Sequence, residues 1–374
     1  MHGAHVRLGG KMVGFGGWSM PVHYPAGILT EYRAVRTAAG VFDISHMGQF
    51  IVSGPGARAW LNGLFTNNLD KIGAGQSQYG FLLNEDGGVI DDLIIYEYSE
   101  EEFLLVVNAS KIDEDFAWMH GRLAPGLELS NRSDRFAALA LQGPRAPEIY
   151  AAFFGPSAGM PPRFGVQVLD RDGLTFVVAR TGYTGEDGFE FFFPARASVL
   201  IWDELLEKGT PFGLLPCGLG SRDSLRLEVC YPLNGADLSA TRTPLAAGLG
   251  IFVDMGKQDF VGRFALLQQR GEGGPAEKLV AFRMTEKSPP PRSHYPVFAQ
   301  GDAADARPIG ETTSGGLSPS LQAGIGMAYV PAAAAKPGAP LAIDIRGKRY
   351  GAVIEKKPLY KRRDDRFTPA SESI

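Results

Sequence analysis

The sequence predicts an α+β protein of two or three domains, with a β-rich domain towards its C-terminal end. The chain has 374 residues, and single hydrophobic cores rarely grow beyond about 250–300 residues. Glycine (48) and proline (26) together make up about a fifth of the chain, against a typical usage of roughly 12%, which favours many turns and strands. Helical and strand-like segments are mixed in the first two thirds of the chain, and short strands broken by Gly, Pro and Ser follow from about residue 253.

Composition excludes several classes of protein. The chain carries 37 Lys and Arg against 41 Asp and Glu, a formal charge of −4, and it lacks the basic stripe of a nucleic-acid binder. No run of 18 or more apolar residues predicts a transmembrane helix. Because Cys217 and Cys230 lack metal-site spacing, we expect a reducing compartment and no bound metal. No targeting signal is visible, so we expect a cytoplasmic location, or the mitochondrial matrix for a eukaryotic protein whose presequence is missing.

The first half of the chain predicts an α+β module. Apolar residues recur at helical spacing in residues 27–39, and Gly40 ends that segment. Amphipathic helices are also predicted at 55–64 and 111–123, and strands rich in Ile, Val, Tyr and Phe at 77–83, 89–98 and 103–107. Residues 51–148 therefore form a predicted middle module.

The second half predicts hairpins, two helices and a β-rich end. Strands at 175–183 and 189–193 flank the turn sequence GEDG, and helices at 196–208 and 221–227 follow. Breakers such as KSPPPRSHYP interrupt the chain after residue 253. We expect an all-β C-terminal domain that is either a barrel or a jelly roll.

The stretch GGVIDDLIIY, residues 87–96, places Asp91 and Asp92 inside a strand that is otherwise apolar. Side chains alternate along a strand, so the two carboxylates lie on opposite faces. A hairpin closed by residues 99–101 makes cross-strand residue numbers sum to 200, which pairs Asp92 with Asn108. One Asp is expected to be structural, capping the strand start or accepting backbone N–H bonds from the turn at Gly87 and Gly88. Burying both without function is disfavoured, because an unpaired buried carboxylate costs several kcal/mol.

Three other candidates are open to two interpretations each. Glu190 lies in an aromatic strand and faces either solvent or a ligand. Arg222 follows Ser221, the predicted N-cap of a helix, and is either an ion-pair partner or a ligand for a carboxylate. His46 has no nucleophile beside it in the sequence, so a structural role is favoured over acid–base chemistry. The glycines before that helix lack the GxGxxG pattern of a dinucleotide site.

Eight segments in the same order resemble the glycine cleavage system T-protein family of aminomethyltransferases, over about residues 11–361. Each motif alone is weak, but the ordered set is specific to that family. The segments are KMVGFGGWSMPVHYP, GVFDISHMGQF, GGVIDDLIIY, LALQGPRA, RTGYTGEDGFE, GLGSRDSLRLE, DFVGRFAL and GETTSGGLSPSL.

The resemblance implies a three-domain cloverleaf that binds tetrahydrofolate as co-substrate. It implies a discontinuous folate-binding domain of residues 1–50 and 149–252, an α+β domain of residues 51–148 and a β-rich domain of residues 253–374. The lipoylated H-protein would deliver an aminomethyl group on its dihydrolipoyl sulfur. The protein would transfer the methylene to tetrahydrofolate and release ammonia. Neither nucleic acid nor a membrane is an expected partner.

The resemblance also implies roles for individual residues. Asp92 would be the catalytic carboxylate beside the folate pterin, and Glu190 would bind the pterin amino groups. Arg222, with Lys361 or Arg362, would meet the folate glutamate or the lipoyl arm. The residues that would line the pocket are Met47, Tyr79, Asn108, Tyr183 and Tyr231.

The chain departs from the family pattern at two places, and other functions of the same fold are alternatives. Residues 245–247 are Leu, Ala and Ala where the family usually has a Glu, and Phe264 replaces a common Glu. Both concern the connection to the third domain and leave Asp92 and Glu190 unchanged. The alternatives are a folate-dependent O- or S-demethylase and a non-catalytic folate-binding protein, but the KGC-x-x-GQE segment that marks the latter is absent.

Overall fold

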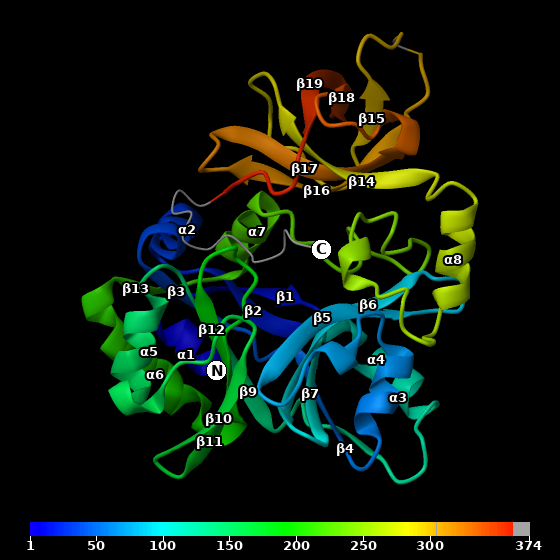
Figure 1. Ribbon diagram of the computed structural model, residues 1–374. Helices are drawn as coiled ribbons and strands as arrows, with labels where there is room; N and C mark the ends of the chain where they lie inside the picture. Colours follow the sequence, from blue (N-terminus) through cyan, green and yellow to red (C-terminus); the bar gives the residue numbers. More distant parts are fainter. Residues whose placement is uncertain (304, 362–374) are drawn as a thin grey trace.

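The computed structural model describes residues 1–303 and 305–361. The chain forms three lobes, each with its own β structure: a six-stranded sheet, a five-stranded sheet and a closed barrel (Figure 1). In Figure 1 the barrel lies at the top and the two open sheets lie below it. The predicted α+β class is therefore confirmed, and the β-rich C-terminal region is a barrel rather than a jelly roll.

The six-stranded sheet is built from segments far apart in the chain, in the order β10-β11-β12-β9-β3-β13. β13 pairs in parallel with β3, and the other neighbours are antiparallel. β9 falls inside the range predicted for the middle module, yet it pairs with β3 and β12. The predicted domain limits otherwise stay a prediction. The strands are β3 (Ala39–Asp43), β9 (Phe136–Gln142), β10 (Val166–Arg171), β11 (Leu174–Ala179), β12 (Gly188–Pro194) and β13 (Leu214–Pro216).

Helices and a hairpin surround this sheet. One face packs against α1 (His2–Arg7), α5 (Ala146–Phe154) and α6 (Ser198–Gly209) through a core rich in Phe, with Trp202 fully buried. α2 (Ile28–Thr37) packs against β3 and against α7 (Leu219–Glu228). A two-stranded hairpin of β1 (Lys11–Phe15) and β2 (Trp18–His23) contacts α7.

The five-stranded sheet is fully antiparallel, in the order β5-β6-β7-β4-β8. Its outer face is covered by α3 (Ala57–Leu64) and α4 (Ile112–His120), whose apolar residues join one core with Phe50, Leu93 and Ile95. The strands are β4 (Gly48–Ser53), β5 (Gln76–Leu83), β6 (Val89–Ser99), β7 (Glu102–Val107) and β8 (Glu128–Asn131).

The two open sheets pack against each other through a shared apolar core. Ile94 and Tyr96 of β6 lie in this core together with Phe192 of β12. Because side chains alternate along strands, Asp92 shares the inter-sheet face with Ile94, and Glu190 shares it with Phe192. Asp91 takes the opposite face, towards the helices of the five-stranded lobe. The alternation therefore assigns the two carboxylates of β6 to different environments.

The closed barrel has the order β14-β17-β16-β15-β18-β19 and contacts α7 through β16. A buried polar cluster joins the two: Arg226 of α7 pairs with Asp237 at 2.8 Å, and the hydroxyl of Ser314 donates to the same carboxylate at 2.8 Å. α8 (Arg263–Gly271) precedes the barrel. The strands are β14 (Glu277–Met284), β15 (Pro296–Ala299), β16 (Gly310–Ser318), β17 (Ala323–Pro331), β18 (Pro340–Ile345) and β19 (Lys348–Glu355).

The residues that depart from the family pattern have different environments. Ala246 and Ala247 are buried in the core between the barrel and the five-stranded lobe, where a glutamate side chain would need a partner. Phe264 is 80% exposed on α8, and nothing in the structure explains its apolar side chain. After β19 the chain returns to α7, where the Tyr360 N–H donates to the Glu228 carbonyl at 2.8 Å.

The helices predicted from periodicity are present within a few residues of their expected limits, but one predicted cap is wrong. Gly218, not Ser221, is the N-cap residue of α7. The Ser221 hydroxyl instead donates to the Gly218 carbonyl at 2.9 Å and to the Glu31 carboxylate at 3.2 Å. Within residues 1–303 and 305–361, no helix has both the length and the apolar character that a membrane span requires.

Candidate functional site

Asp92 lies half-buried on the inter-sheet face of β6, among neutral hydrogen-bond donors. Its carboxylate accepts the Tyr79 hydroxyl at 2.9 Å and the Asn108 amide at 3.1 Å, and the Asn234 side chain also donates to it. The predicted register is confirmed beside Asp92, since Ile94 pairs with Val106 and so continues the sum of 200. The predicted loop of residues 99–101 is wrong, because a bulge after Glu97 lets Ser99 pair with Glu102. No described cation forms an ion pair with Asp92.

Asp91 has the structural role expected for one member of the pair. It is fully buried, and its two oxygens accept the Asn108 backbone N–H at 2.9 Å and the Asn108 side-chain amide at 2.8 Å. Its remaining neighbour is Asp115 of α4, whose side chain forms a hydrogen bond with it. Asn108 therefore binds both carboxylates of β6 at once.

The electrostatic environment makes Asp92 a weak acid for a carboxyl group. Burial, together with the adjacent Asp91, raises the pKa of Asp92 to about 7. Burial also raises the pKa of Asp91, while the bonds from Asn108 oppose that rise. Asp92 therefore changes its charge near neutral pH, which suits a group that orients a polar substrate or exchanges a proton.

Glu190 on β12 is not solvent-facing, because it is only 7% exposed. Its Oε2 atom accepts the Tyr96 hydroxyl at 2.9 Å and the Thr181 hydroxyl at 2.5 Å. No described residue donates to its Oε1 atom. Since Tyr96 comes from β6 and Glu190 from β12, this bond joins the two sheets, four residues along β6 from Asp92. One carboxylate oxygen is thus held by the fold, and the other is left without a partner.

Arg222 forms no close ion pair with a described carboxylate, although the charge of Glu190 acts on it electrostatically. Its Nη1 atom is buried and forms no hydrogen bond with a described group. The guanidinium lies 4.8 Å from the centre of the Tyr183 ring and 5.9 Å from that of Phe42. Burial and the nearby Arg222 charge lower the pKa of His46 to about 4. His46 is therefore neutral at physiological pH, which agrees with a structural role.

The remaining predicted pocket residues lie around this group. The Tyr183 hydroxyl donates to the Pro232 carbonyl, and the Tyr183 ring lies 5.8 Å from the Tyr231 ring. Asp92 and Arg222 both act electrostatically on Tyr183. Met47 is half-buried in the turn that joins β3 of one sheet to β4 of the other.

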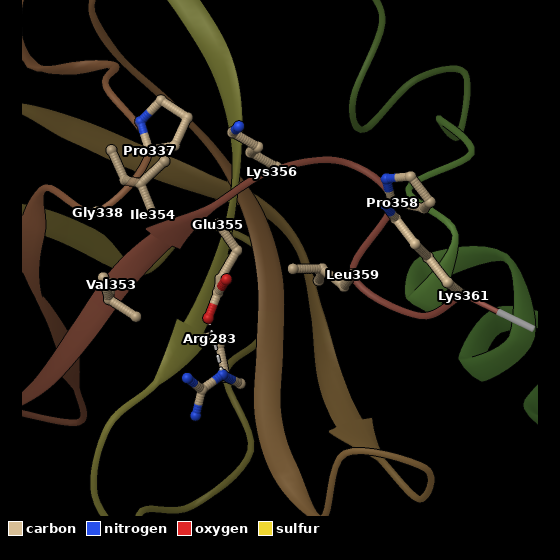
Figure 2. Close-up of a pocket in the computed structure, with 10 residues that line it drawn as sticks. All are labelled: Arg283, Pro337, Gly338, Val353, Ile354, Glu355, Lys356, Pro358, Leu359 and Lys361. Atoms are coloured by element: carbon tan, nitrogen blue, oxygen red, sulfur yellow. Dashed lines mark hydrogen bonds and ion pairs between the residues drawn. The ribbon is translucent and has the colours of Figure 1, made fainter. Parts of the chain in front are cut away.

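Lys361 lies at the edge of the barrel and not among the residues around Asp92. It borders a hollow of about 550 Å³ at the barrel edge, together with Pro337, Ile354 and Leu359. Figure 2 shows Arg283 and Glu355 paired within this hollow, at 3.0 Å, with Lys361 beyond Leu359. No described contact links Lys361 to Asp92. Arg362, the alternative to Lys361, lies outside the described residues.

Four residues near the site were missed by the sequence analysis. Tyr96 lies four residues after Asp92 on β6, so the alternation of side chains along the strand places both on the same face. Thr181 precedes Tyr183 in the same predicted hairpin, but its bond to Glu190 depends on how the chain turns. Asn234 and Asp115 carry no local signal, because they reach β6 from distant segments.

The fold and this arrangement define a class: an α+β protein of three lobes whose two packed sheets hold Asp92, Glu190 and Arg222 between them or at their junction with α7. Within residues 1–303 and 305–361, no three His, Cys, Asp or Glu side chains are grouped as metal ligands. Two family models match the chain. The GCVT N-terminal domain matches residues 1–257, and the glycine cleavage T-protein C-terminal barrel domain matches residues 277–361. The chain therefore belongs to the glycine cleavage T-protein family.

Relatives and a solved structure agree with this assignment. The chain is 45% identical to "Aminomethyltransferase" of Geobacillus thermodenitrificans (strain NG80-2), over 96% of each chain. It is 44% identical to "Aminomethyltransferase" of Desulfitobacterium hafniense (strain DSM 10664 / DCB-2), again over 96% of each. The crystal structure of glycine cleavage system aminomethyltransferase T from Bartonella henselae superposes with a TM-score of 0.89 at 33% identity and covers 97% of both chains.

Proposed function

We propose that the chain is the aminomethyltransferase of the glycine cleavage system. It transfers the methylene of an aminomethyl group, carried on the dihydrolipoyl sulfur of the H-protein, to tetrahydrofolate, and ammonia is released. The observation that carries the proposal is the match to aminomethyltransferases over 96% of the chain. The half-buried Asp92 and the buried Glu190, on facing sheets, add chemical support.

Asp92 is the proposed catalytic carboxylate. Tyr79 and Asn108 hold its two oxygens in place, so the carboxylate is oriented before substrate arrives. Its ionised form stabilises the positive charge that develops on the aminomethyl carbon as a bond to that carbon breaks. It also orients the pterin so that N5 attacks this carbon. Because the pKa of Asp92 is raised to about 7, the ionised form predominates only above neutral pH.

Glu190 is the proposed acceptor for the pterin amino groups. Tyr96 and Thr181 donate to its Oε2 atom, which fixes the plane of the carboxylate. Its Oε1 atom receives no described donor and is left for the N–H groups of a flat polar ring. A carboxylate held in this way distinguishes a pterin from an apolar ring of the same size.

Arg222 is the proposed partner of the negatively charged glutamate of folate. It fits that role because its guanidinium is partly desolvated and its buried Nη1 atom has no hydrogen-bond partner among the described residues. Met47, Tyr183 and Tyr231 line the proposed pocket. The roles of Lys361 and Arg362 with the glutamate or the lipoyl arm, and the cytoplasmic location, stay predictions.

The test is a reconstituted reaction of aminomethylated H-protein with tetrahydrofolate, with and without this protein. Formation of 5,10-methylenetetrahydrofolate and of ammonia is measured in the same samples. We expect both products to form together and at equal rates. Tetrahydrofolate binding without stimulated formation of either product would contradict the proposal and favour a demethylase or a non-catalytic folate-binding protein.

A further inference from the structure

Asp115 is a fully buried acidic residue that the proposed reaction does not use. It lies on α4, which covers the outer face of the five-stranded sheet, and its side chain points at Asp91 rather than at the inter-sheet face. No described donor reaches either of its carboxyl oxygens apart from this contact. A buried carboxyl group on a covering helix, with only another carboxyl as its partner, needs a physical explanation.

Two carboxyl groups in contact inside a protein cannot both be ionised, because the repulsion and the desolvation of two like charges are too large. The pair therefore shares one proton. The negative charge of the Asp91–Asp115 pair has no ion-pair partner in Lys111, the residue before α4, because Lys111 pairs with Glu114 at 2.8 Å. Asp91 accepts two N–H bonds from Asn108, which favour its ionised form, whereas neither Asp115 oxygen has such a donor. Asp115 is therefore the protonated member, in agreement with its raised pKa, which follows from burial and the Asp91 charge.

A chain of hydrogen bonds connects this acid to the proposed catalytic group. The Asp115 carboxylic acid donates to Asp91, which accepts the backbone N–H and the side-chain amide of Asn108 at 2.9 and 2.8 Å. The Asn108 amide then donates to Asp92 at 3.1 Å. If Asp91 took up the proton itself, it would lose acceptor capacity towards Asn108.

We propose that Asp115 is a positioning residue: as a neutral acid it donates to Asp91, keeps Asp91 ionised, and so holds Asn108 in the orientation that fixes Asp92. The proposal rests on the proposed function, because it assigns Asp115 an effect on turnover through Asp92. Asp115 does not touch substrate. It acts across the sheet, from the helix-covered face to the inter-sheet face.

The test compares Asp115→Asn with Asp115→Leu, and Asp113→Ala is the control. The amide of Asn keeps a donor towards Asp91, whereas Leu fills a similar volume without one. Asp113 is exposed on the same helix. We expect Asp115→Leu to lower kcat about tenfold or more while the KM for tetrahydrofolate changes less than about twofold, because orientation rather than binding is lost. Asp115→Asn should restore kcat to within about threefold of the unmodified protein.

An infrared measurement tests the shared proton without using activity. The spectra are recorded at about pH 9, where Asp92 is ionised because its pKa is about 7. The unmodified protein should then show the carbonyl band of a buried, protonated carboxylic acid, and Asp115→Asn should lack it. Absence of that band in the unmodified protein, or equal kcat losses in Asp115→Asn and Asp115→Leu, would overturn the proposal. An unmodified protein that shows the band but makes no methylenetetrahydrofolate would instead contradict the proposed function.

Discussion

Buried charges are treated in opposite ways at two places in this molecule. At the junction of α7 with α2 and the barrel, each buried charge has an opposite charge beside it: Arg226 pairs with Asp237 and Arg36 with Glu228, both at 2.8 Å. Between the two open sheets, Asp92 and Glu190 have only neutral hydrogen-bond donors among the described residues, and Arg222 acts on Glu190 without forming a close ion pair. Buried charges therefore form ion pairs within the protein at the junction of the lobes. The two carboxylates between the open sheets, where a ligand is expected, form none with the described residues.

This difference has a physical basis. A buried ion pair is costly to break, because the remaining partner stays buried without compensation. A buried carboxylate with neutral donors is costly to keep ionised, which raises the pKa of Asp92. Changes at the junction should therefore alter stability, whereas changes between the sheets should alter binding and turnover.

The largest expected effect is on turnover when the charge of Asp92 is removed. Asp92→Asn keeps the shape and the contact with Tyr79 but cannot become an anion. We expect kcat for ammonia release to fall about 10²–10⁴-fold, in the range of lost charge stabilisation or acid–base catalysis, while the folded structure and much of the tetrahydrofolate affinity are retained. Unchanged turnover would show that Asp92 has no catalytic role.

The largest expected effect on stability is at the junction. Asp237→Ala removes the buried partner of Arg226, leaving it only the half-exposed Asp223, and removes the acceptor of the Thr313 and Ser314 hydroxyls. We expect the free energy of unfolding to fall by about 3–5 kcal/mol, measured by urea denaturation. A loss below about 1 kcal/mol, as for a surface pair, would contradict the distinction between junction and site.

Substitutions of Glu190 test whether the carboxylates between the two open sheets serve ligand binding. Glu190→Ala should weaken tetrahydrofolate binding about 10- to 100-fold, because a charged acceptor for the pterin N–H groups is lost. Glu190→Gln, which keeps one acceptor oxygen, is the matched control and should have an intermediate affinity. Calorimetric titration gives both values. Equal affinity of all three proteins would show that Glu190 does not contact the ligand.

The smallest effect is expected for an exposed pair, Arg7 with Asp203, in which both side chains are about half exposed. Arg7→Ala should change the free energy of unfolding by less than about 1 kcal/mol and leave turnover unchanged. This variant is the reference for the buried charges at the junction and for those between the two open sheets. A large loss of stability would mean that solvent exposure does not separate strong pairs from weak ones in this molecule.

Sequence reasoning succeeded where the determining interactions are local. The hairpin of β6 and β7 is short, so its register and the contact of Asp92 with Asn108 followed from counting residues. One of the two Asp residues does accept a backbone N–H, but the donor is Asn108 and not the predicted glycine turn.

The rest depended on contacts between distant segments. Alternation places Glu190 on one of two faces, but only the packing of the two sheets shows that this face is buried. The membership of β9 in the six-stranded sheet could not be predicted either, because Phe136–Gln142 is apolar on both faces and lies in the middle of the chain. The local sequence around Ser221 is typical of an N-cap, but its hydroxyl forms a hydrogen bond with Glu31 on α2, which is distant in the sequence.

The pH dependence of thermal unfolding of the unmodified protein and of Asp92→Asn tests the central comparison most directly. The folded-state pKa of Asp92 is raised from 3.8 to about 7, so the stability contributed by its proton is present below about pH 4 and is lost as the pH rises through about 7. The account predicts equal melting temperatures near about pH 4 and a higher melting temperature for Asp92→Asn at about pH 8. A lower melting temperature for Asp92→Asn at about pH 8 would show that the fold depends on this charge, as it does at the junction, and would contradict the account.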